Sequence, residues 1–145
     1  MSTIGDILSY KGSHVLSIGK GASVMDAAVV MNEHKVGAVV VADEGRLVGM
    51  FTERDVLRRV VGERRDPATT LVADVMTTEV VCCTPETSIE EARGAMKNRR
   101  IRHLPVCDGD GRLAGMISIG DLNAFHVNSQ EQTIHLLHEY LYGRV

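Results

Sequence analysis

Hydrophobic and polar residues follow a pattern that occurs twice along this chain. Residues 23–31 and 88–96 each begin with a serine, and apolar residues then recur at i, i+3 and i+7, which is typical of an amphipathic helix. The apolar positions are Val24, Ala27 and Met31 in the first copy and Ile89, Ala92 and Met96 in the second. Ser23 and Ser88 are suitable N-caps, and Ser88 with Glu91 forms a capping box. The pattern therefore predicts the same helix in both copies.

A β-rich stretch follows each predicted helix and is interrupted by a short polar turn. The apolar residues on both sides of that turn predict a hairpin, and a second helix follows it. Each copy therefore has the predicted order turn, strand, helix, strand, strand and helix. The predicted elements are residues 6–8, 15–18, 23–31, 36–42, 47–52 and about 53–61 in the first copy, and 74–76, 80–83, 88–96, 101–107, 113–118 and about 120–127 in the second.

The doubling divides the chain into two repeats. We predict an α/β (α+β) fold in which repeat one covers residues 1–62 and repeat two covers residues 74–128. Each repeat has a small β-sheet flanked by two helices, and the repeats are related by pseudo-two-fold symmetry. Residues 63–73 form a polar linker that contains a proline. Because each unit is too small to bury a large core alone, we expect the repeats to pack against each other.

Residues 129–145 predict a final helix. Ser129 with Gln132 forms a capping box, and the helix carries an apolar stripe. The stripe consists of Ile134, Leu137 and Leu141. A terminal helix needs a surface to bury such a stripe, and we expect that surface to belong to a second copy of the chain. We expect His135 and His138 at the helix surface or in this dimer contact, not in a metal site.

Composition narrows the possible partners. The 145 residues carry a net charge of -3, and only 3% of them are aromatic. Such a chain favours neither nucleic acid nor an anionic membrane surface, and it contains no apolar run of the roughly 20 residues that span a bilayer. The N-terminus does not resemble a signal peptide, and we expect the three cysteines to be free thiols. We therefore expect a soluble, cytoplasmic protein.

A hydroxyl and an acid stand at the same place in both copies. Thr52 precedes Asp55, and Ser118 precedes Asp121, by three residues at the start of a predicted helix. A carboxylate can accept hydrogen bonds from both hydroxyls of a ribose, and the free backbone N–H groups at a helix start can hold a phosphate. The alternative is that the hydroxyls are helix caps and the acids merely favour the helix dipole.

The motifs around these pairs recur in order. They are Gly49-Met50-Phe51-Thr52-Glu53-Arg54-Asp55, Asp74-Val75-Met76-Thr77, Arg102-His103-Leu104-Pro105-Val106 and Gly115-Met116-Ile117-Ser118-Ile119-Gly120-Asp121. Together they resemble a tandem pair of cystathionine-β-synthase (CBS) domains, a Bateman module, of the stand-alone bacterial type. The resemblance implies a regulatory module, not an enzyme, that senses AMP, ADP, ATP or NAD(H), with S-adenosylmethionine less expected. It also implies a homodimer that passes the signal to a separate regulated protein.

The resemblance further implies two crossed ligand sites, each completed by the early strand of the other copy. Site one would use Thr52, Asp55, Thr77, Val81, Cys82, Arg100, Arg102, His103 and Pro105. Site two would use Ser118, Asp121, Ser9, Leu16, Ser17, Lys35, Gly37 and Ala38. Residues 99–103 are more basic than their counterparts at 34–38, so we predict that site one prefers the more phosphorylated ligand. In the alternative, these arginines only form a solvated helix end.

Other chemistry is weakly marked. The motifs pair no nucleophile with a base and an orienting acid, so we predict no catalytic residue. Cys82 and Cys83 are adjacent on a predicted strand and point to opposite faces, so we predict no metal site, and we expect Cys107 in the core. Two other functions stay open, namely a dimerising scaffold with vestigial sites and a small nucleotide-cleaving enzyme that uses the basic cluster.

Overall fold

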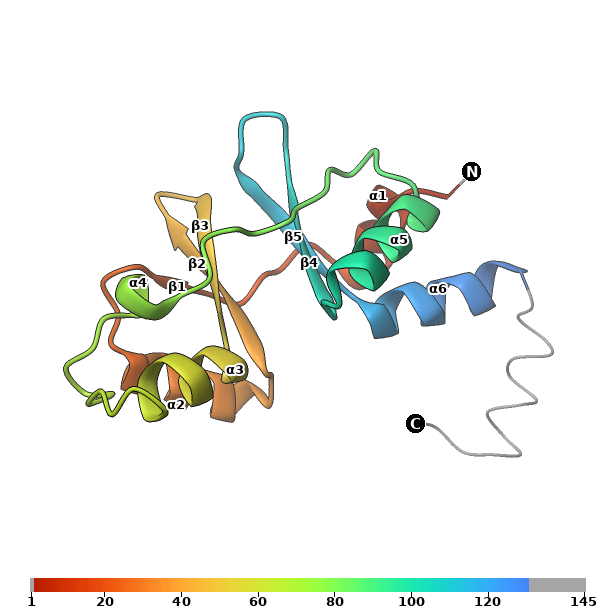
Figure 1. Cartoon of the computed structure of the whole chain (residues 1–145). Helices are drawn as coiled ribbons and strands as arrows, with labels where there is room; N and C mark the ends of the chain where they lie inside the picture. The colour runs from red at the N-terminus through yellow and green to blue at the C-terminus, as the bar shows by residue number, and fades with distance from the viewer. Residues whose placement is uncertain (1, 131–145) are drawn as a thin grey trace.

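Each repeat forms a small β-sheet with helices packed beside it in the computed structural model, which describes residues 2–130 (Figure 1). In repeat one, β1 (Ser17–Gly19) runs parallel to β2 (Ala38–Asp43), which pairs antiparallel with β3 (Arg46–Thr52). In repeat two, β4 (His103–Cys107) and β5 (Leu113–Ser118) form the corresponding antiparallel hairpin. Both predicted hairpins and the mixed α and β fold are therefore confirmed.

The early strand of repeat two differs from the prediction. Of residues 80–83, Cys83 alone pairs with β4, through hydrogen bonds from Cys83 N to Pro105 O at 3.0 Å and from Cys107 N to Cys83 O at 2.8 Å. A few residues upstream, Thr77 pairs with Met50 of β3 through two backbone hydrogen bonds of 2.8 and 2.9 Å. This segment crosses from one repeat to the other, so it cannot also run along β4, and the prediction of a strand at 80–83 is wrong.

The two capped helices are present as predicted. Helix α2 (Val24–His34) and helix α5 (Ile89–Arg99) each begin after a serine whose Oγ accepts a hydrogen bond from a backbone N–H. In α5, Glu91 N donates to Ser88 Oγ at 3.1 Å and Ser88 N donates to Glu91 Oε1 at 3.2 Å, which completes the predicted capping box. Both helices end at a basic residue in the left-handed conformation, Lys35 with φ 54° and Arg100 with φ 55°.

The second helix of each copy takes a different form. In repeat one it consists of α3 (Glu53–Asp55) and the π-helical segment η1 (Val56–Val61), whereas in repeat two it is the α-helix α6 (Ile119–Gln130). Helix α6 passes the predicted end near residue 127, so no helix boundary lies at Ser129. The remainder of the predicted helix at 129–145, with its apolar stripe and two histidines, lies outside the described residues.

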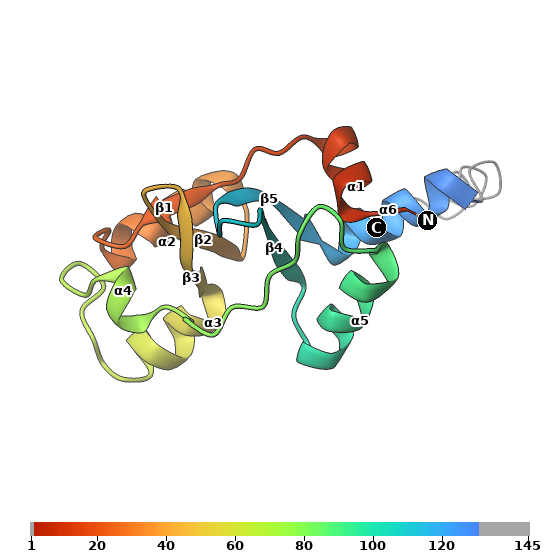
Figure 2. The ribbon, with the colours of Figure 1, turned by 90° about the horizontal axis from the view of Figure 1, so that it is seen from above.

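Two short segments that we predicted as turns are helices, and each packs on the opposite repeat. Helix α1 (Ile4–Lys11) lies beside α5 and α6 of repeat two, and α4 (Val72–Val75) lies beside the sheet of repeat one (Figures 1 and 2). Ile4 and Ile7 of α1 and Val72 and Val75 of α4 are at most 2% exposed there. The exchange ties the two repeats together, because each hydrophobic core is closed by a helix from the other half of the chain.

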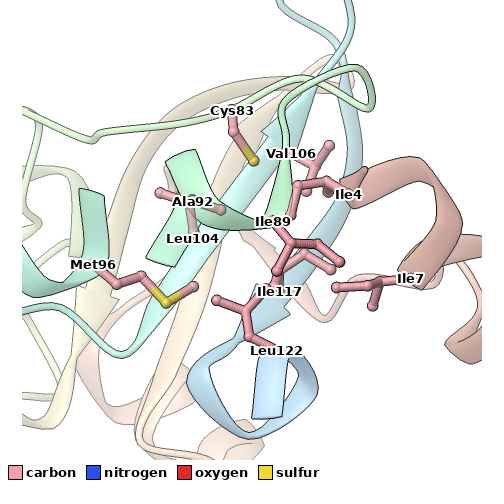
Figure 3. Packing of buried hydrophobic residues seen from close by; sticks show 10 residues of the cluster. All are labelled: Ile4, Ile7, Cys83, Ile89, Ala92, Met96, Leu104, Val106, Ile117 and Leu122. Carbon is pink, nitrogen blue, oxygen red and sulfur yellow. The ribbon is translucent and has the colours of Figure 1, made fainter. Parts of the chain in front are cut away.

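The core of repeat two shows this exchange directly. Ile4 and Ile7 of α1 lie among side chains from α5, β4, β5 and α6 (Figure 3). These partners are Ile89, Ala92, Met96, Leu104, Val106, Ile117 and Leu122. In the core of repeat one, Val72 and Val75 pack with the buried face of α2 and with Phe51. Val72 belongs to the segment that we predicted as a linker, and the division of the chain at residues 62 and 74 stays a prediction.

The turns of the two hairpins also meet. Arg46 and Arg112 form an antiparallel bridge, and Leu113 N donates to Gly45 O at 3.0 Å. Gly45 and Gly111 have positive φ angles of 81° and 80°, which glycine adopts without strain. Contacts therefore join the repeats at the hairpin turns as well as at the exchanged helices. Among residues 2–130, none of the helices combines the length and the apolar character needed to cross a membrane.

Candidate ligand cleft

A cleft of about 470 Å³ is lined by residues of both repeats. Its residues come from β2, β3, α3 and η1 of repeat one, from the crossing segment at 77–81, and from the end of α5 through the start of β4 in repeat two. Seven residues predicted for site one line it: Thr52, Asp55, Thr77, Val81, Arg100, Arg102 and His103. We call this site the Asp55 cleft.

Asp55 is the most buried charged group of the cleft, with a relative exposure of 5%. Its carboxylate closes the capping box of α3, because Oδ2 accepts a hydrogen bond from Thr52 N at 3.0 Å and Asp55 N donates to Thr52 Oγ1 at 3.2 Å. The hydroxyl of Thr77 lies 3.2 and 3.3 Å from its two oxygens. The helix-cap role is thus present, and the Thr77 hydroxyl is a neutral partner that a ligand hydroxyl could replace.

Six arginines line the cleft, three from each repeat. They are Arg54, Arg58, Arg59, Arg99, Arg100 and Arg102. Glu53 and Glu79 line it too, so cations outnumber acids even when Asp55 is counted. The basic cluster of repeat two was predicted from the sequence, whereas the three arginines of repeat one were not. The signal that could have found them is their spacing within seven residues after Thr52, where a helical turn brings them near the cleft.

Arg59 connects three parts of the site. Its Nη1 donates to Val75 O at 3.2 Å and to Met76 O at 2.9 Å, and its Nε lies 3.7 Å from Asp55 Oδ1. It therefore holds the end of α4 and stands beside the buried carboxylate. This arginine lies in the π-helical segment, and π-turns occur frequently at functional sites.

Two residues predicted for site one lie elsewhere. Pro105 is buried within β4, and Cys82 is exposed in a separate hollow of about 390 Å³ that Cys83 and Cys107 also line. Burial raises the pKa of the Cys83 thiol to about 12 and that of Cys107 to about 11. Such thiols stay protonated near neutral pH and are poor nucleophiles. Cys107 is buried, as predicted.

Asp121 of repeat two has a different partner. Ser118 N donates to Asp121 Oδ2 at 2.8 Å and Asp121 N donates to Ser118 Oγ at 3.0 Å, which repeats the cap of Asp55. Lys11 Nζ lies 2.7 Å from the same Oδ2 and 3.0 Å from Met116 O. Burial alone would raise the pKa of Asp121, but hydrogen bonds from Lys11 and Ser118 outweigh it and hold that pKa below its usual 3.8. No sequence motif marks Lys11, because its contact depends on α1 packing against the opposite repeat.

The other residues predicted for site two do not gather around Asp121. Gly37 and Ala38 line the Asp55 cleft. The Ser9 hydroxyl donates to Gly5 O at 3.0 Å within α1. Leu16 packs against the core of repeat one, Ser17 pairs with β2, and Lys35 is exposed at the end of α2. The described structure therefore gathers most of predicted site one, whereas predicted site two is represented around Asp121 by the Ser118 pair and the unpredicted Lys11.

His103 stands between the two acidic positions. It lines the Asp55 cleft, and on β4 it is the register partner of Ser118. Burial lowers the pKa of His103 below 6.5, and the positive charges of Arg102 and Lys11 lower it further, while Asp121 acts in the opposite direction. The imidazole is therefore mostly neutral near pH 7.

Close packing explains the glycine of the doubled Gly-Met motif. A Cβ added to Gly49 would lie 2.6 Å from Met76 Sδ and 2.9 Å from Thr77 O, and one added to Gly115 would lie 2.7 Å from Leu8 Cδ2. Met76 follows α4 and Leu8 belongs to α1, the two exchanged helices. Glycine at these positions lets each exchanged segment approach the opposite sheet.

Comparison with known proteins identifies the family that this fold and cleft define. The model of the CBS domain matches the chain twice, at residues 4–62 and 72–126. The chain belongs to the CBS domain family and contains a tandem pair of these domains. The resemblance seen in the motifs is therefore confirmed.

Particular relatives agree with this assignment. The chain is 36% identical over 151 residues to the CBS domain-containing protein CBSX3, mitochondrial, of Arabidopsis thaliana, and the match covers 98% of this chain and 73% of that protein. A putative signal-transduction protein with CBS domains from Burkholderia ambifaria MC40-6 is 38% identical, with a TM-score of 0.80 over 92% of this chain and 99% of its own. The CBS domain protein PAE2072 from Pyrobaculum aerophilum, solved in complex with AMP, shares the fold with a TM-score of 0.73 at 24% identity, over 82% and 88% of the two chains.

Proposed function

We propose that this protein is a regulatory module that binds an adenosine-containing ligand in the Asp55 cleft and passes the change to a separate partner. The observation that carries the proposal is a buried carboxylate in a cleft that both CBS domains line with arginines. The fold can hold such a ligand, because the PAE2072 protein was solved with AMP bound. AMP, ADP, ATP and NAD(H) are the candidates, with S-adenosylmethionine less favoured.

The role of Asp55 follows from its hydrogen bonds. Two hydroxyls of a ribose can donate to one carboxylate, and hydrogen bonds to a charged acceptor are among the stronger ones. The Thr77 contacts at 3.2 and 3.3 Å are long for such bonds, so a ribose can take their place at little cost. The bond from Thr52 N would keep the carboxylate oriented during this exchange.

The arginines provide the second half of the recognition. A guanidinium presents several donors in a plane and matches a phosphate group in a bidentate manner. Arg58 and Arg59 approach from repeat one, and Arg100 and Arg102 approach from repeat two. A phosphate chain held by arginines of both repeats would link their positions. We therefore propose that a di- or triphosphate binds more tightly than AMP.

The signal would arise from differential binding. A ligand that prefers one arrangement of the two CBS domains increases the population of that arrangement. At about 100 times its dissociation constant it stabilises that state by about 2.7 kcal/mol, which is enough to shift a nearly balanced equilibrium. The regulated partner would recognise the surface that the favoured arrangement presents.

We also propose that the protein is a homodimer. Met25 and Val29 on α2 are 44% and 46% exposed, and Leu57 and Val61 on η1 are 64% and 63% exposed. Both helices pack on the same core, through Val24, Ala27 and Met31 of α2 and Val60 of η1, and exposed apolar groups on such helices favour association. The proposed cytoplasmic location is supported by three cysteines that are free thiols.

Two alternative functions stay open. CBS domain proteins are generally regulatory, non-enzymatic modules, which favours a sensor over a nucleotide-cleaving enzyme. A scaffold with vestigial sites would not need a cleft with a buried carboxylate and six arginines. Incubation with ATP followed by chromatography of the products separates enzyme from sensor, since a sensor returns ATP unchanged.

Ligand titration tests the main proposal. Calorimetry and thermal shift with AMP, ADP, ATP, NAD(H) and S-adenosylmethionine should show binding of at least one, and Asp55→Asn should abolish it. Asp110→Asn in the exposed hairpin turn is the matched control and should bind as the wild type does. Absence of binding by every ligand, or unchanged binding by Asp55→Asn, would refute the proposal. Equal loss of ATP affinity in Arg102→Ala and Lys35→Ala would refute the preference for phosphate in this cleft.

A further inference from the structure

Equivalent hydrogen-bond acceptors in the two repeats receive their hydrogen bonds from different donors. In repeat one, Thr77 serves both the Asp55 carboxylate, through its hydroxyl, and Met50 O, through its backbone N–H at 2.8 Å. The corresponding acceptors of repeat two are the Asp121 carboxylate and Met116 O. A single ammonium, Lys11 Nζ, serves both, at 2.7 and 3.0 Å.

The length of the exchanged helices explains this difference. Helix α4 ends at Val75, so Thr77 is extended and can pair with β3, whereas α1 continues to Lys11. Ser9, the counterpart of Thr77, is therefore inside a helix and its hydroxyl donates to Gly5 O instead. The repeat alignment that pairs these residues also pairs Lys11 with Glu79, an exposed acid of the Asp55 cleft. The charge at this position is thus reversed between the two sites.

A ligand should therefore lose more binding free energy on entering at Asp121 than at Asp55. At Asp55 a ribose replaces a neutral hydroxyl, because the Arg59 Nε lies 3.7 Å away, beyond hydrogen-bond distance. The backbone bonds between Thr77 and Met50 can remain. At Asp121 it must compete with a charged donor at 2.7 Å, and removal of that donor also leaves Met116 O without its partner. The carboxylate is reachable, since the side chains of Lys11 and Asp121 are 35% and 25% exposed. Access is therefore limited by the ammonium and not by depth.

We propose that Lys11 is a built-in competitor at Asp121, so that each chain binds one adenosine ligand, at Asp55, and the second site opens only when this ammonium is removed. This inference rests on the proposed function. A charge-assisted hydrogen bond of this kind corresponds to about 10- to 100-fold in affinity. Lys11→Met should therefore raise the affinity at Asp121 by about that factor and leave the Asp55 cleft unchanged.

Calorimetric stoichiometry with AMP and, separately, ATP tests the inference. The wild type should bind one nucleotide per chain, and Asp55→Asn should remove it. Lys11→Met keeps the apolar stem and should bind two, and the double variant Lys11→Met/Asp55→Asn should bind one, which places the new site in repeat two. Lys20→Met is the matched control, because it removes the exposed ion pair with Asp43 at 3.0 Å, and it should still bind one.

The outcomes separate the inference from the proposed function. Two nucleotides bound by the wild type, or one bound by both the wild type and a folded Lys11→Met variant, would overturn the role of Lys11 alone. If Lys11→Met fails to fold, Lys11→Gln carries the same expectation, since it also removes the charge. No nucleotide bound by any of these proteins would defeat the proposed function and this inference with it.

Discussion

The packing of the exchanged segment on β3 makes Gly49→Ala a sharp test of how the Asp55 cleft is built. The new Cβ would lie 2.6 Å from Met76 Sδ, 3.1 Å from Met76 Cγ and 2.9 Å from Thr77 O, whereas ordinary contact begins at 3.4 Å. The methionine side chain can rotate away from this contact. The Thr77 oxygen cannot, because it accepts a hydrogen bond from Met50 N at 2.9 Å. Relief of the clash therefore requires the bridge between the repeats to open.

Two contributions set the loss of stability expected for Gly49→Ala. Overpacking of a close contact costs about 1–3 kcal/mol. Loss of a backbone hydrogen bond adds about 1 kcal/mol. We therefore expect Gly49→Ala to lower the free energy of unfolding by about 2–4 kcal/mol, measured by urea denaturation with circular dichroism. Because Thr77 also contacts Asp55, the variant should bind nucleotide more weakly as well.

Two other glycines serve as controls for this experiment. At Gly115 the obstacle is the end of the Leu8 side chain, which can move, so Gly115→Ala should cost less than Gly49→Ala. At Gly94, inside α5, a Cβ meets nothing within 4 Å, and alanine should stabilise the helix by up to about 1 kcal/mol. If Gly49→Ala unfolds at the same urea concentration as Gly94→Ala, the crossing segment is not held tightly against β3.

Three further predictions concern single side chains of the cleft. Thr77→Val should lower the free energy of unfolding in urea by about 1 kcal/mol, because the Asp55 carboxylate loses a buried hydrogen-bond donor. Thr77→Ser keeps that donor and should unfold as the wild type does, so equal free energies for the two variants would contradict this role of Thr77. Arg100→Gly should raise the free energy of unfolding by about 0.5–1 kcal/mol, because glycine adopts the left-handed φ of 55° without strain. The same variant should bind ATP more weakly in calorimetry, and an unchanged ATP affinity would exclude Arg100 from the site. His103 has a pKa lowered below 6.5, so the unfolded chain binds more protons there and stability should fall as the pH drops below 6.5. The free energy of unfolding should change less between pH 7.5 and pH 5.5 in His103→Gln than in the exposed control His14→Gln. Identical changes in the two variants would refute this role of His103.

The site was only partly predictable, and the reason differs from residue to residue. Thr52 and Asp55 are three residues apart at a strand end, so local geometry places them together, and the motif predicts them. Arg59 and Lys11 are not marked by any motif. Arg59 lies one helical turn after Asp55, and Lys11 reaches Asp121 from 110 residues away. A long-range contact such as that of Lys11 depends on which repeat each short helix packs against.

The repeated elements of this protein follow from local sequence alone: two serine-capped helices, two hairpins and two hydroxyl–acid pairs. These features depend on local periodicity and on hydrogen bonds between residues three or four positions apart, which the chain encodes directly. Long-range packing makes α1 and α4 exchange places and pairs the crossing segment with β3, so that no strand forms at 80–83. The same packing brings six arginines into one cleft. It also gives Asp55 a hydrogen bond from a neutral hydroxyl across the repeats, whereas Asp121 receives one from a lysine. These outcomes depend on the burial of apolar helix faces between distant parts of the chain, and no local pattern records them.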